Sequence, residues 1–283
     1  MKKKLLSTLL VGALAIASLT GCGAASAGAT GAQDTLAKVV TSQKLTVACI
    51  LTNEPFGTYD EQGNPIGYDV DIAYMLAESL GIPQENVEII NTPASERITA
   101  LESGKADVVI GNFTRRLDRA QKVQFTNPYN AAAVGGLVLK GNEVETIEDL
   151  EGKVIYGDAG TTNEEALNYV IEQGINITDI RGEDSSGIMQ LDSGKCDITF
   201  QDSTVCAYMA MKYPDKYSYC FTDSSLLGVA PFYDGLGVRK DDQNWLNYLN
   251  TFVYQINLDG RNAAAYEKWF GSPRTICLTP DFY

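Results

Sequence analysis

Short apolar runs alternate with longer amphipathic segments along most of this chain. Runs of about three to seven residues that are apolar on both faces and end at Gly, Asp or Pro are typical of buried parallel strands. The sequence predicts such strands at 45–51, 87–90, 108–110, 154–156, 177–180, 196–200 and 217–221. Apolar positions spaced three and four apart predict helices at 69–80, 95–103, 245–258 and 263–270. Strands that alternate with helices indicate an α/β fold.

The helix predicted at 69–80 carries the clearest end signals. Asp69 is suited to its N-cap, and Ile72, Leu76 and Leu80 share one face. Gly81 follows the last apolar position, where a left-handed residue commonly ends a helix. These positions predict an amphipathic helix that begins at Asp69.

Two segments of the chain resemble each other. Residues 98–114 (ITALESGKADVVIGNFT) and 188–204 (IMQLDSGKCDITFQDST) are identical at seven of seventeen positions, at a constant offset of ninety residues. Each segment contains the end of an amphipathic helix, a Ser-Gly-Lys break and a buried strand. Similar units so far apart predict two α/β lobes of like design.

Polar side chains follow the strand of each unit. Asn112 and Thr114 follow the first strand, whereas Asp202 and Ser203 follow the second. Because an open α/β sheet binds ligands beyond the carboxyl ends of its strands, we expect these residues to face one cleft between the lobes.

Arg119 lies a few residues beyond the first strand, in a stretch expected to form a short helical turn. A guanidinium offers two parallel donors to a carboxylate, and neighbouring polar and backbone groups can complete the shell. With Arg119 on one wall and Asp202 on the other, the cleft would hold a zwitterion by its carboxylate and its ammonium. The alternative is that Arg119 only pairs with Asp118 or Glu102 on a solvated face.

A second group for an anion is expected where Gly160, Thr161, Thr162 and Asn163 open a helix. The free N–H groups and the dipole of a helix start favour negative charge. Gly160 has no second glycine or following lysine, so it is a weak signal for phosphate.

The first residues predict export. Lys2 to Lys4 give a cationic start, and residues 5–19 are an apolar run too short to span a bilayer comfortably, so we expect a signal peptide at 1–21. Leu19-Thr20-Gly21-Cys22 resembles the lipobox of bacterial lipoproteins, which implies cleavage before Cys22 and lipid on that residue. The alternative is an ordinary signal peptide beside a chance cysteine.

The Ala-, Gly-, Ser- and Thr-rich residues 22–43 are expected to form a flexible tether. The folded part then begins at residue 44 and has room for two modest lobes. We expect lobe 1 to contain residues 44–134 and 232–283, and lobe 2 to contain residues 135–231 with the crossovers.

Composition excludes several classes of function. The formal charge is −14, and removal of Lys2, Lys3 and Lys4 with the signal peptide would make it −17. So acidic a chain is a poor candidate for binding nucleic acid or anionic lipid headgroups. The sequence has no histidine, which excludes Ser-His-Asp and Cys-His nucleophiles and His-ligated zinc.

Five cysteines follow Cys22, and none forms a Cys-x-x-Cys pair. They are Cys49, Cys196, Cys206, Cys220 and Cys277. Most lie in apolar runs, which favours core packing. A bridge between Cys206 and Cys220 stays open, because an exported protein can carry disulfides.

Motifs spread over residues 44–271 resemble the family 3 solute-binding proteins of amino-acid ABC transporters. The motifs are Glu54-Pro55-Phe56, Gly67-Tyr68-Asp69-Val70-Asp71, Leu101 with Ser103-Gly104-Lys105 and Asp107, Arg119 with Phe125-Thr126-Asn127-Pro128-Tyr129, Asp149-Leu150-Glu151-Gly152-Lys153, Gly160-Thr161-Thr162, and Lys268-Trp269-Phe270-Gly271. The resemblance implies a type II periplasmic-binding-protein fold, in which two α/β lobes joined by two strand crossovers close on a ligand.

The resemblance also implies roles for single residues. Arg119 would clamp the α-carboxylate of an amino acid together with the N–H of Thr162, and Asp202 would bind the α-ammonium. The remaining ligand-binding positions are expected at Asn53, Gly111, Asn112, Thr114, Thr161 and Asn163. No cofactor and no metal are expected.

The side-chain subsite departs from the common pattern of the family. Ile50, Asn53 and Ala94 replace acidic, polar or aromatic residues, and Arg116 stands where a threonine is usual. Arg97 matches an arginine that acidic-amino-acid binders of this family use. The alternative for Arg97 is a salt bridge to Glu96 or Glu102.

These observations predict a lipid-anchored, extracytoplasmic, monomeric receptor that delivers a polar, and by Arg97 an acidic, L-amino acid to a permease and its ATPase. Two other functions stay open. The fold also resembles periplasmic cyclohexadienyl dehydratases, for which Glu54 is a conceivable general acid. A sensor or adhesin lipoprotein of the same fold is the other.

Overall fold

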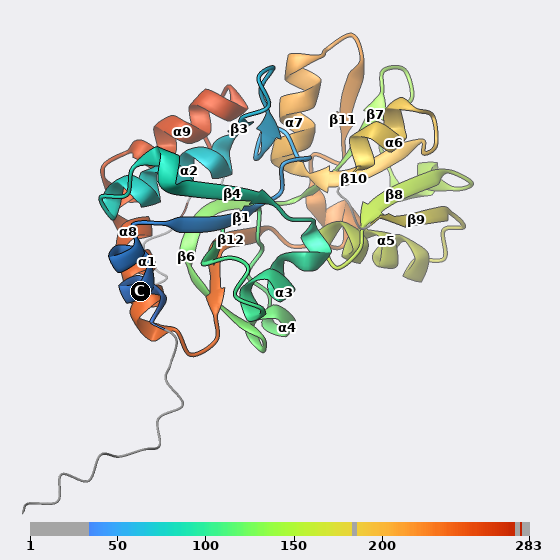
Figure 1. Ribbon diagram of the computed structural model, residues 1–283. Helices are drawn as coiled ribbons and strands as arrows, with labels where there is room; N and C mark the ends of the chain where they lie inside the picture. Colours follow the sequence, from blue (N-terminus) through green and yellow to red (C-terminus); the bar gives the residue numbers. More distant parts are fainter. Residues whose placement is uncertain (1–33, 183–185, 275–277, 279–283) are drawn as a thin grey trace, which may run out of the picture. The chain divides into compact units, whose positions relative to one another are not determined.

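The computed structural model describes residues 34–182, 186–274 and 278, and these residues form two five-stranded sheets and a hairpin (Figure 1). The first sheet has the order β4 (Val87–Asn91), β1 (Leu45–Cys49), β5 (Val108–Val109), β12 (Phe232–Arg239) and β6 (Val123–Ala132). The second has the order β11 (Tyr217–Cys220), β7 (Val134–Leu139), β10 (Ile198–Asp202), β8 (Val154–Asp158) and β9 (Thr178–Gly182). The hairpin pairs β2 (Thr58–Tyr59) with β3 (Pro65–Ile66). We call the first sheet with its helices lobe 1, and the second sheet with its helices lobe 2.

Both large sheets are mixed. In lobe 1, β1 pairs in parallel with β4 and β5, whereas β12 runs antiparallel to β5 and β6. In lobe 2, β8 pairs in parallel with β9 and β10, whereas β7 runs antiparallel to β10 and β11. Parallel strands buried between helices explain the continuous apolar runs in the sequence. The predicted α/β fold with two lobes is confirmed.

Two neighbouring strands connect the lobes. β6 ends at Ala132 and β7 begins at Val134, so the chain crosses to lobe 2 between them. The chain returns through β12, whose first residue, Phe232, pairs with Ala132. The register of β12 on β6 shifts on either side of Gly235, and such irregular pairing bends a strand locally. The hinge is therefore built from two antiparallel strands lying side by side.

The helices agree with the predicted pattern in most places. Lobe 1 carries α1 (Thr35–Ser42), α2 (Tyr68–Ser79), α3 (Arg97–Glu102), α4 (Leu117–Ala120), α8 (Gln243–Leu258) and α9 (Arg261–Phe270). Lobe 2 carries α5 (Thr162–Glu172), α6 (Gly187–Asp192) and α7 (Ser203–Lys212). Short 3-10 turns occur at η1 (Gln84–Asn86), η2 (Ala94–Glu96), η3 (Ile147–Leu150) and η4 (Ser224–Leu227). The helix predicted at 95–103 is divided into η2 and α3.

The predicted tether at 22–43 is wrong for its last part, because α1 occupies residues 35–42. Asp34 caps this helix by accepting a hydrogen bond from the N–H of Ala37. Val39 is buried in the core of lobe 1, and the hydroxyl of Thr35 donates to Asp242. The sequence did not predict this helix, because one buried valine and one buried threonine give only a weak helical pattern.

The predicted signal peptide at 1–21 and the lipidation site Cys22 lie outside the described residues. Within the described ranges, no helix combines the length and the apolar character that a bilayer crossing requires.

Asp69 is not the N-cap of α2, because the helix begins one residue earlier and Gly67 occupies that position. The carboxylate of Asp69 is buried instead. It accepts hydrogen bonds from the backbone N–H of Asn112 at 2.8 Å and from the hydroxyl of Tyr129 at 2.7 Å. Asp69 therefore fixes the segment that follows β5, which leads directly to the site described below.

The internal repeat predicted from the sequence is confirmed as a structural unit. α3 and α6 are related by the offset of ninety residues, and so are the starts of β5 and β10. Gly104 and Gly194 both adopt positive φ angles, of 73° and 68°, in the break between helix and strand. Only glycine takes this conformation readily, which explains why both copies have it.

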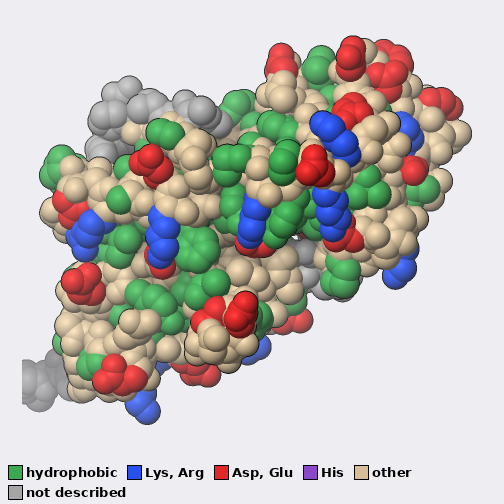
Figure 2. All heavy atoms as spheres, turned by 90° about the horizontal axis from the view of Figure 1, so that it is seen from above, with side chains coloured by type: hydrophobic (Ala, Val, Ile, Leu, Met, Phe, Trp, Pro, Cys, Tyr) green, Lys and Arg blue, Asp and Glu red, His purple; other side chains and the backbone are tan. Residues whose placement is uncertain are grey.

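The four described cysteines, Cys49, Cys196, Cys206 and Cys220, are free and buried, whereas Cys277 lies outside the described residues. Burial raises the pKa of the Cys49 and Cys206 thiols. On the face shown in Figure 2, basic side chains are interspersed with acidic ones and form no continuous basic patch.

Candidate functional site

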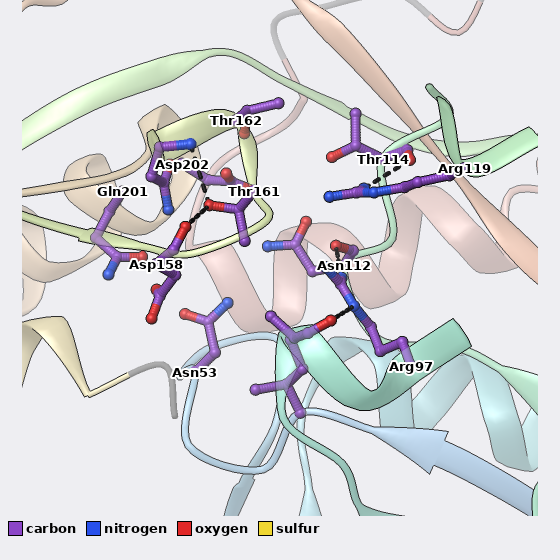
Figure 3. A pocket seen from close by; sticks show the side chains of 13 residues that line it. Asn53, Arg97, Asn112, Thr114, Arg119, Asp158, Thr161, Thr162, Gln201 and Asp202 are labelled. Carbon is purple, nitrogen blue, oxygen red and sulfur yellow. Dashed lines mark hydrogen bonds between the residues drawn. The ribbon is translucent and has the colours of Figure 1, made fainter. Parts of the chain in front are cut away.

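Side chains of both lobes enclose a small cavity (Figure 3). Lobe 1 contributes Ile50, Asn53, Ala94, Arg97, Asn112, Thr114 and Arg119, and lobe 2 contributes Asp158, Thr161, Thr162, Asn163, Gln201 and Asp202. The cavity has a volume of about 30 Å³, whereas a groove on the surface has a volume of about 580 Å³. The cavity is therefore nearly closed and has no room for a peptide.

Nine of the ten ligand-binding residues predicted from the sequence line this cavity. The tenth, Gly111, instead presents its carbonyl oxygen to Arg97. The two strand tips of the repeat meet here as Asn112 and Asp202. Ser203 does not take part, because its hydroxyl accepts a hydrogen bond from the backbone N–H of Ala133 at the lobe crossing.

Asn112 is held in an uncommon backbone conformation. Its φ angle is 47°, in the left-handed region that asparagine tolerates better than most residues. The hydrogen bond from its N–H to Asp69 and that from Arg97 to its carbonyl oxygen fix this turn. The Asn112 side chain consequently points into the cavity, where it favours the ionised form of Asp202.

Arg97 is buried, and most of its donors already bind the backbone. Its Nε donates to the carbonyl of Ala94 at 3.0 Å, and its Nη1 donates to those of Gly111 and Asn112 at 2.8 and 2.6 Å. The guanidinium also lies over the ring of Phe113, 4.6 Å from its centre. Burial lowers the pKa of Arg97 to about 10. None of these contacts is the salt bridge to Glu96 or Glu102 that the sequence left as the alternative, and within the described residues Nη2 has no hydrogen-bond partner.

Arg119 likewise does not pair with Asp118 or Glu102. Its Nη1 donates to the carbonyl of Thr114 at 2.8 Å, and its Nη2 crosses to lobe 2 and donates to the carbonyl of Gly160 at 2.6 Å. Burial, and next the charge of Arg97, lower the pKa of Arg119 to about 9. Two guanidiniums thus share one wall, which favours an anionic group between them.

The start of α5 faces Arg119 from lobe 2. Thr161 is the N-cap, and its hydroxyl accepts from the N–H of Asn163 and donates to the carbonyl of Asp158 at 2.6 Å. The first helical residues, Thr162 and Asn163, are buried against the cavity. The positive end of the helix dipole therefore faces the same space as the two guanidiniums.

Asp202 ends β10 and provides a carboxyl group on the lobe 2 wall. Its side chain is buried, and Oδ2 has no hydrogen-bond partner among the described residues. Burial, and next the charge of Asp234, raise the pKa of Asp202 to about 8. An oxygen that lacks a donor in a buried site is suited to a ligand ammonium.

Two polar residues of the site were not predicted. Asp158 and Gln201 are buried and line the cavity opposite Arg97 (Figure 3). The hydroxyl of Tyr156 donates to Asp158 at 3.0 Å. Asp158 ends a buried strand, so the rule that identified Asn112 and Asp202 would have identified it too.

Further contacts join the lobes beside the cavity. Arg116 of lobe 1 forms an ion pair with Glu165 of α5. Glu54 accepts hydrogen bonds from the Tyr208 hydroxyl at 2.8 Å and from Lys212 Nζ at 2.6 Å, both on α7. These contacts require the lobes to be close together.

The profile of the bacterial extracellular solute-binding proteins, family 3, matches residues 45–272. The chain belongs to this family. The L-cystine-binding protein TcyJ of Escherichia coli (strain K12) is 28% identical over 268 residues, covering 94% of this chain and 96% of that protein. The glutamate/aspartate import solute-binding protein of the same strain is 26% identical over 270 residues, covering 92% and 87%.

A solved structure gives the same result for the fold. The ancestral amino acid-binding protein AncCDT-1, described as a precursor of cyclohexadienyl dehydratase, superposes with a TM-score of 0.73 at 29% identity, covering 83% of this chain and 99% of that chain. The periplasmic-binding-protein fold expected for this family 3 member is therefore confirmed.

Proposed function

We propose that this solute-binding protein is an extracytoplasmic receptor for one L-amino acid and delivers it to an ABC permease. The observation that carries this proposal is the opposition of Arg119 and Asp202 across one buried cavity. Arg119 with the start of α5 would bind the α-carboxylate, and Asp202 would bind the α-ammonium. Both curated relatives described above bind amino acids, which supports the same ligand class.

The side chain of the ligand is the finer question. The sequence predicted an acidic amino acid from Arg97, and Nη2 of that residue supports a hydrogen-bond acceptor in the ligand. The structure adds Asp158 to this subsite, because this buried side chain lines the cavity opposite Arg97. An additional carboxylate near Asp158 would be repelled.

We therefore favour a neutral polar side chain over the acidic one. A carboxamide offers an oxygen to Arg97 and an NH₂ group to Asp158 and Asn53. It therefore matches both the hydrogen-bond donor and the hydrogen-bond acceptors of this subsite. A lysine or arginine ligand would place a second cation beside Arg97, which opposes its binding.

A thermal-shift screen over the twenty L-amino acids, followed by calorimetric titration, tests both parts. A ligand that binds only the folded protein raises its melting temperature. We expect asparagine or glutamine to bind more tightly than aspartate or glutamate. Asp158→Asn should reverse this preference if that carboxylate excludes acidic ligands. Tightest binding of aspartate or glutamate by the wild type would restore the acidic assignment, and no stabilisation by any amino acid would overturn the receptor function.

An enzymatic function is less well supported. Glu54, the conceivable general acid of a dehydratase, does not line the cavity and binds Tyr208 and Lys212 instead. We propose that the ligand is bound without chemical change. Unchanged prephenate and arogenate after incubation with the purified protein would agree with this proposal.

Anchoring at the membrane is proposed from the lipobox-like residues Leu19 to Cys22. Lipid on Cys22 would keep a monomeric receptor near its permease and ATPase. Cys22→Ser should release the protein from the membrane fraction or leave it unprocessed. Lipid labelling of that variant at the wild-type level would contradict this assignment.

A further inference from the structure

A buried tyrosine lies behind Asp158, one of the two polar residues of the site that the sequence did not predict. Tyr156 precedes Asp158 by two residues on β8, so the two side chains share one face of the strand. Tyr156 is 1% exposed and does not line the cavity. Its hydroxyl donates a hydrogen bond to Asp158 Oδ1 at 3.0 Å. The function proposed above uses Asp158 but gives Tyr156 no role.

The hydroxyl of Tyr156 belongs to a chain of hydrogen bonds with one direction. Ser186 Oγ lies 3.4 Å from the hydroxyl oxygen of Tyr156, and Gln190 Nε2 donates to Ser186 Oγ at 3.1 Å. A tyrosine hydroxyl has one proton, and here this proton points to Asp158, so the tyrosine oxygen accepts from Ser186. Every donor of the chain therefore points toward Asp158. The chain supports Asp158 from behind as a hydrogen-bond acceptor.

Two glycines make room for this tyrosine. A Cβ atom at Gly182 would lie 1.7 Å from the hydroxyl oxygen of Tyr156, and one at Gly187 would lie 2.9 Å from its Cδ1 atom. Neither glycine has a positive φ angle, so the backbone does not require glycine at either position. A phenylalanine ring would fill the same space as the tyrosine ring. Packing of the ring therefore does not account for the hydroxyl.

Lobe 2 contains a second tyrosine–aspartate pair, which is separate from the cavity. Tyr217 is buried on β11, and its hydroxyl donates to Asp192 Oδ1 at 2.8 Å. Asp192 also forms an ion pair with Lys216 at 2.8 Å. Neither Tyr217 nor Asp192 lines the cavity. The same hydrogen bond thus occurs once beside the site and once away from it, which provides a matched control.

We propose that Tyr156 is a positioning residue for ligand selectivity: its hydroxyl fixes the carboxyl group of Asp158 as an acceptor at the cavity, which favours a ligand side chain that donates N–H groups over one that carries a carboxylate. A hydrogen bond from a hydroxyl favours the ionised form of a carboxyl group. A carboxylate held in one orientation accepts from an amide NH₂ group and repels a second carboxylate. This inference rests on the proposed function, in which Asp158 contacts the side chain of the ligand.

Tyr156→Phe removes the hydroxyl and keeps the ring. Calorimetric titrations with asparagine, aspartate, glutamine and glutamate give the ratio of amide affinity to acid affinity. This ratio should fall about three- to tenfold in Tyr156→Phe, the usual effect of one hydrogen bond. Tyr217→Phe loses an equivalent hydrogen bond and should keep the wild-type ratio. An unchanged ratio in Tyr156→Phe, or an equal fall in Tyr217→Phe, would overturn the inference and leave the receptor function in place.

A double-mutant cycle shows whether Tyr156 acts through Asp158. Asp158→Asn alone should lower the ratio of amide affinity to acid affinity. Adding Tyr156→Phe to Asp158→Asn should change this ratio little further, because the residue that the hydroxyl positions is already altered. If Tyr156→Phe lowers the ratio as strongly in the Asp158→Asn protein as in the wild type, the positioning role is wrong.

The contact itself can be tested without a ligand. Proton NMR of the full chain with labelled tyrosine should show a hydroxyl signal that Tyr156→Phe removes and Asp158→Asn shifts, since an amide oxygen is a weaker acceptor than a carboxylate. A Tyr156 hydroxyl signal that Asp158→Asn leaves in place would overturn the inference, whatever the ligand is. If the signal shifts but the wild type binds none of the four amino acids, the selectivity role and the carboxamide assignment are both wrong. The screen over the twenty amino acids then decides the receptor function separately.

Discussion

Asn112 and Asp202 occupy the same place in two copies of one structural unit, ninety residues apart. In each copy a helix, a left-handed glycine and a buried strand lead to this position. In lobe 1 this position holds an uncharged amide, and Arg119 follows it, whereas in lobe 2 it holds the carboxyl group of Asp202. The same backbone design thus presents a cation on one wall of the cavity and a carboxyl group on the other.

The helix starts of the two units differ for a steric reason. Arg97 begins α3 and binds the carbonyls that follow β5, whereas Gly187 begins α6. A Cβ atom at Gly187 would lie 2.3 Å from the hydroxyl oxygen of Thr199 and 2.8 Å from Nε2 of Gln201. In lobe 2, side chains of the strand itself occupy the space that Arg97 fills in lobe 1.

Other features are the same in both copies and serve the fold. Asp107 accepts a hydrogen bond from the N–H of Thr46 at 3.1 Å, and Asp197 accepts one from the N–H of Val154 at 2.8 Å. Each aspartate fixes the start of its strand to the neighbouring parallel strand. The comparison therefore separates what both lobes need for folding from what only one of them contributes to the site.

Removal of Arg119 or Asp202, the residues proposed to bind the two charged groups of the ligand, should have the largest effect on affinity. Arg119→Ala and Asp202→Ala should each weaken amino-acid binding by about 2–5 kcal/mol, or roughly thirty- to several-thousand-fold, because each leaves a ligand charge buried without its partner. Calorimetric titration measures the change. Arg181→Ala, which removes an arginine from exposed ion pairs on lobe 2, is the matched control and should bind normally. Near-normal affinity of Arg119→Ala or Asp202→Ala would show that the role assigned to that residue is wrong.

The second prediction concerns the pH dependence of stability. Of the two equivalent positions Asn112 and Asp202, only Asp202 can titrate. Burial raises the pKa of Asp69 to about 7 and that of Asp202 to about 8, so between pH 4 and 8 the folded protein holds more protons than the unfolded chain. Stability without ligand should therefore fall as pH rises from 6 to 8, on the order of 3 kcal/mol. Asp202→Asn makes the two tips alike and should reduce this slope in denaturant titrations. Equal slopes in both proteins would contradict the prediction.

Gly187→Ala tests the steric difference between the helix starts. The added methyl group should lower the free energy of unfolding by about 1–3 kcal/mol, since Thr199 and Gln201 leave no room for it. Urea titration measures the loss. The control is Met189→Ala, at an exposed position of the same helix, α6. Gly174→Ala would be a poor control, because Gly174 has a positive φ angle that alanine does not adopt readily. Full stability of Gly187→Ala would remove the steric explanation.

The smallest effect is expected at a contact between the lobes outside the cavity. Glu54→Gln weakens the interaction with Lys212 and Tyr208, which forms only when the lobes are close. Because the pair is partly exposed, it should contribute about 0.2–1 kcal/mol, or a one- to fivefold loss of affinity. Raising the salt concentration should weaken binding by the wild type more than by the variant. The opposite salt dependence would exclude this contact from closure.

Sequence reasoning predicted those parts of the molecule in which the spacing of apolar side chains and the positions of glycines decide the structure. The repeat, the buried strands and the two strand tips are such features. Arg97 was harder, because the carbonyls of Gly111 and Asn112 that bind it depend on a backbone turn that no residue pattern encodes. Asp69 was assigned to a helix cap for the same reason: its partners, Asn112 and Tyr129, are far away in the sequence. The contacts of Asp234 with Asn130 and Thr114 could not be anticipated either, because they depend on the pairing of the hinge strand β12.

The burial of the four described cysteines has a practical consequence. Their thiols are shielded from reagents, so a cysteine introduced on the surface would react selectively in a chain whose Cys22 and Cys277 are changed to serine. Leu117, whose side chain is 88% exposed two residues before Arg119, offers such a place on lobe 1. Paired with a second label at the exposed Met189 of lobe 2, a fluorescent dye at this position would turn the protein into an optical biosensor of its own solute.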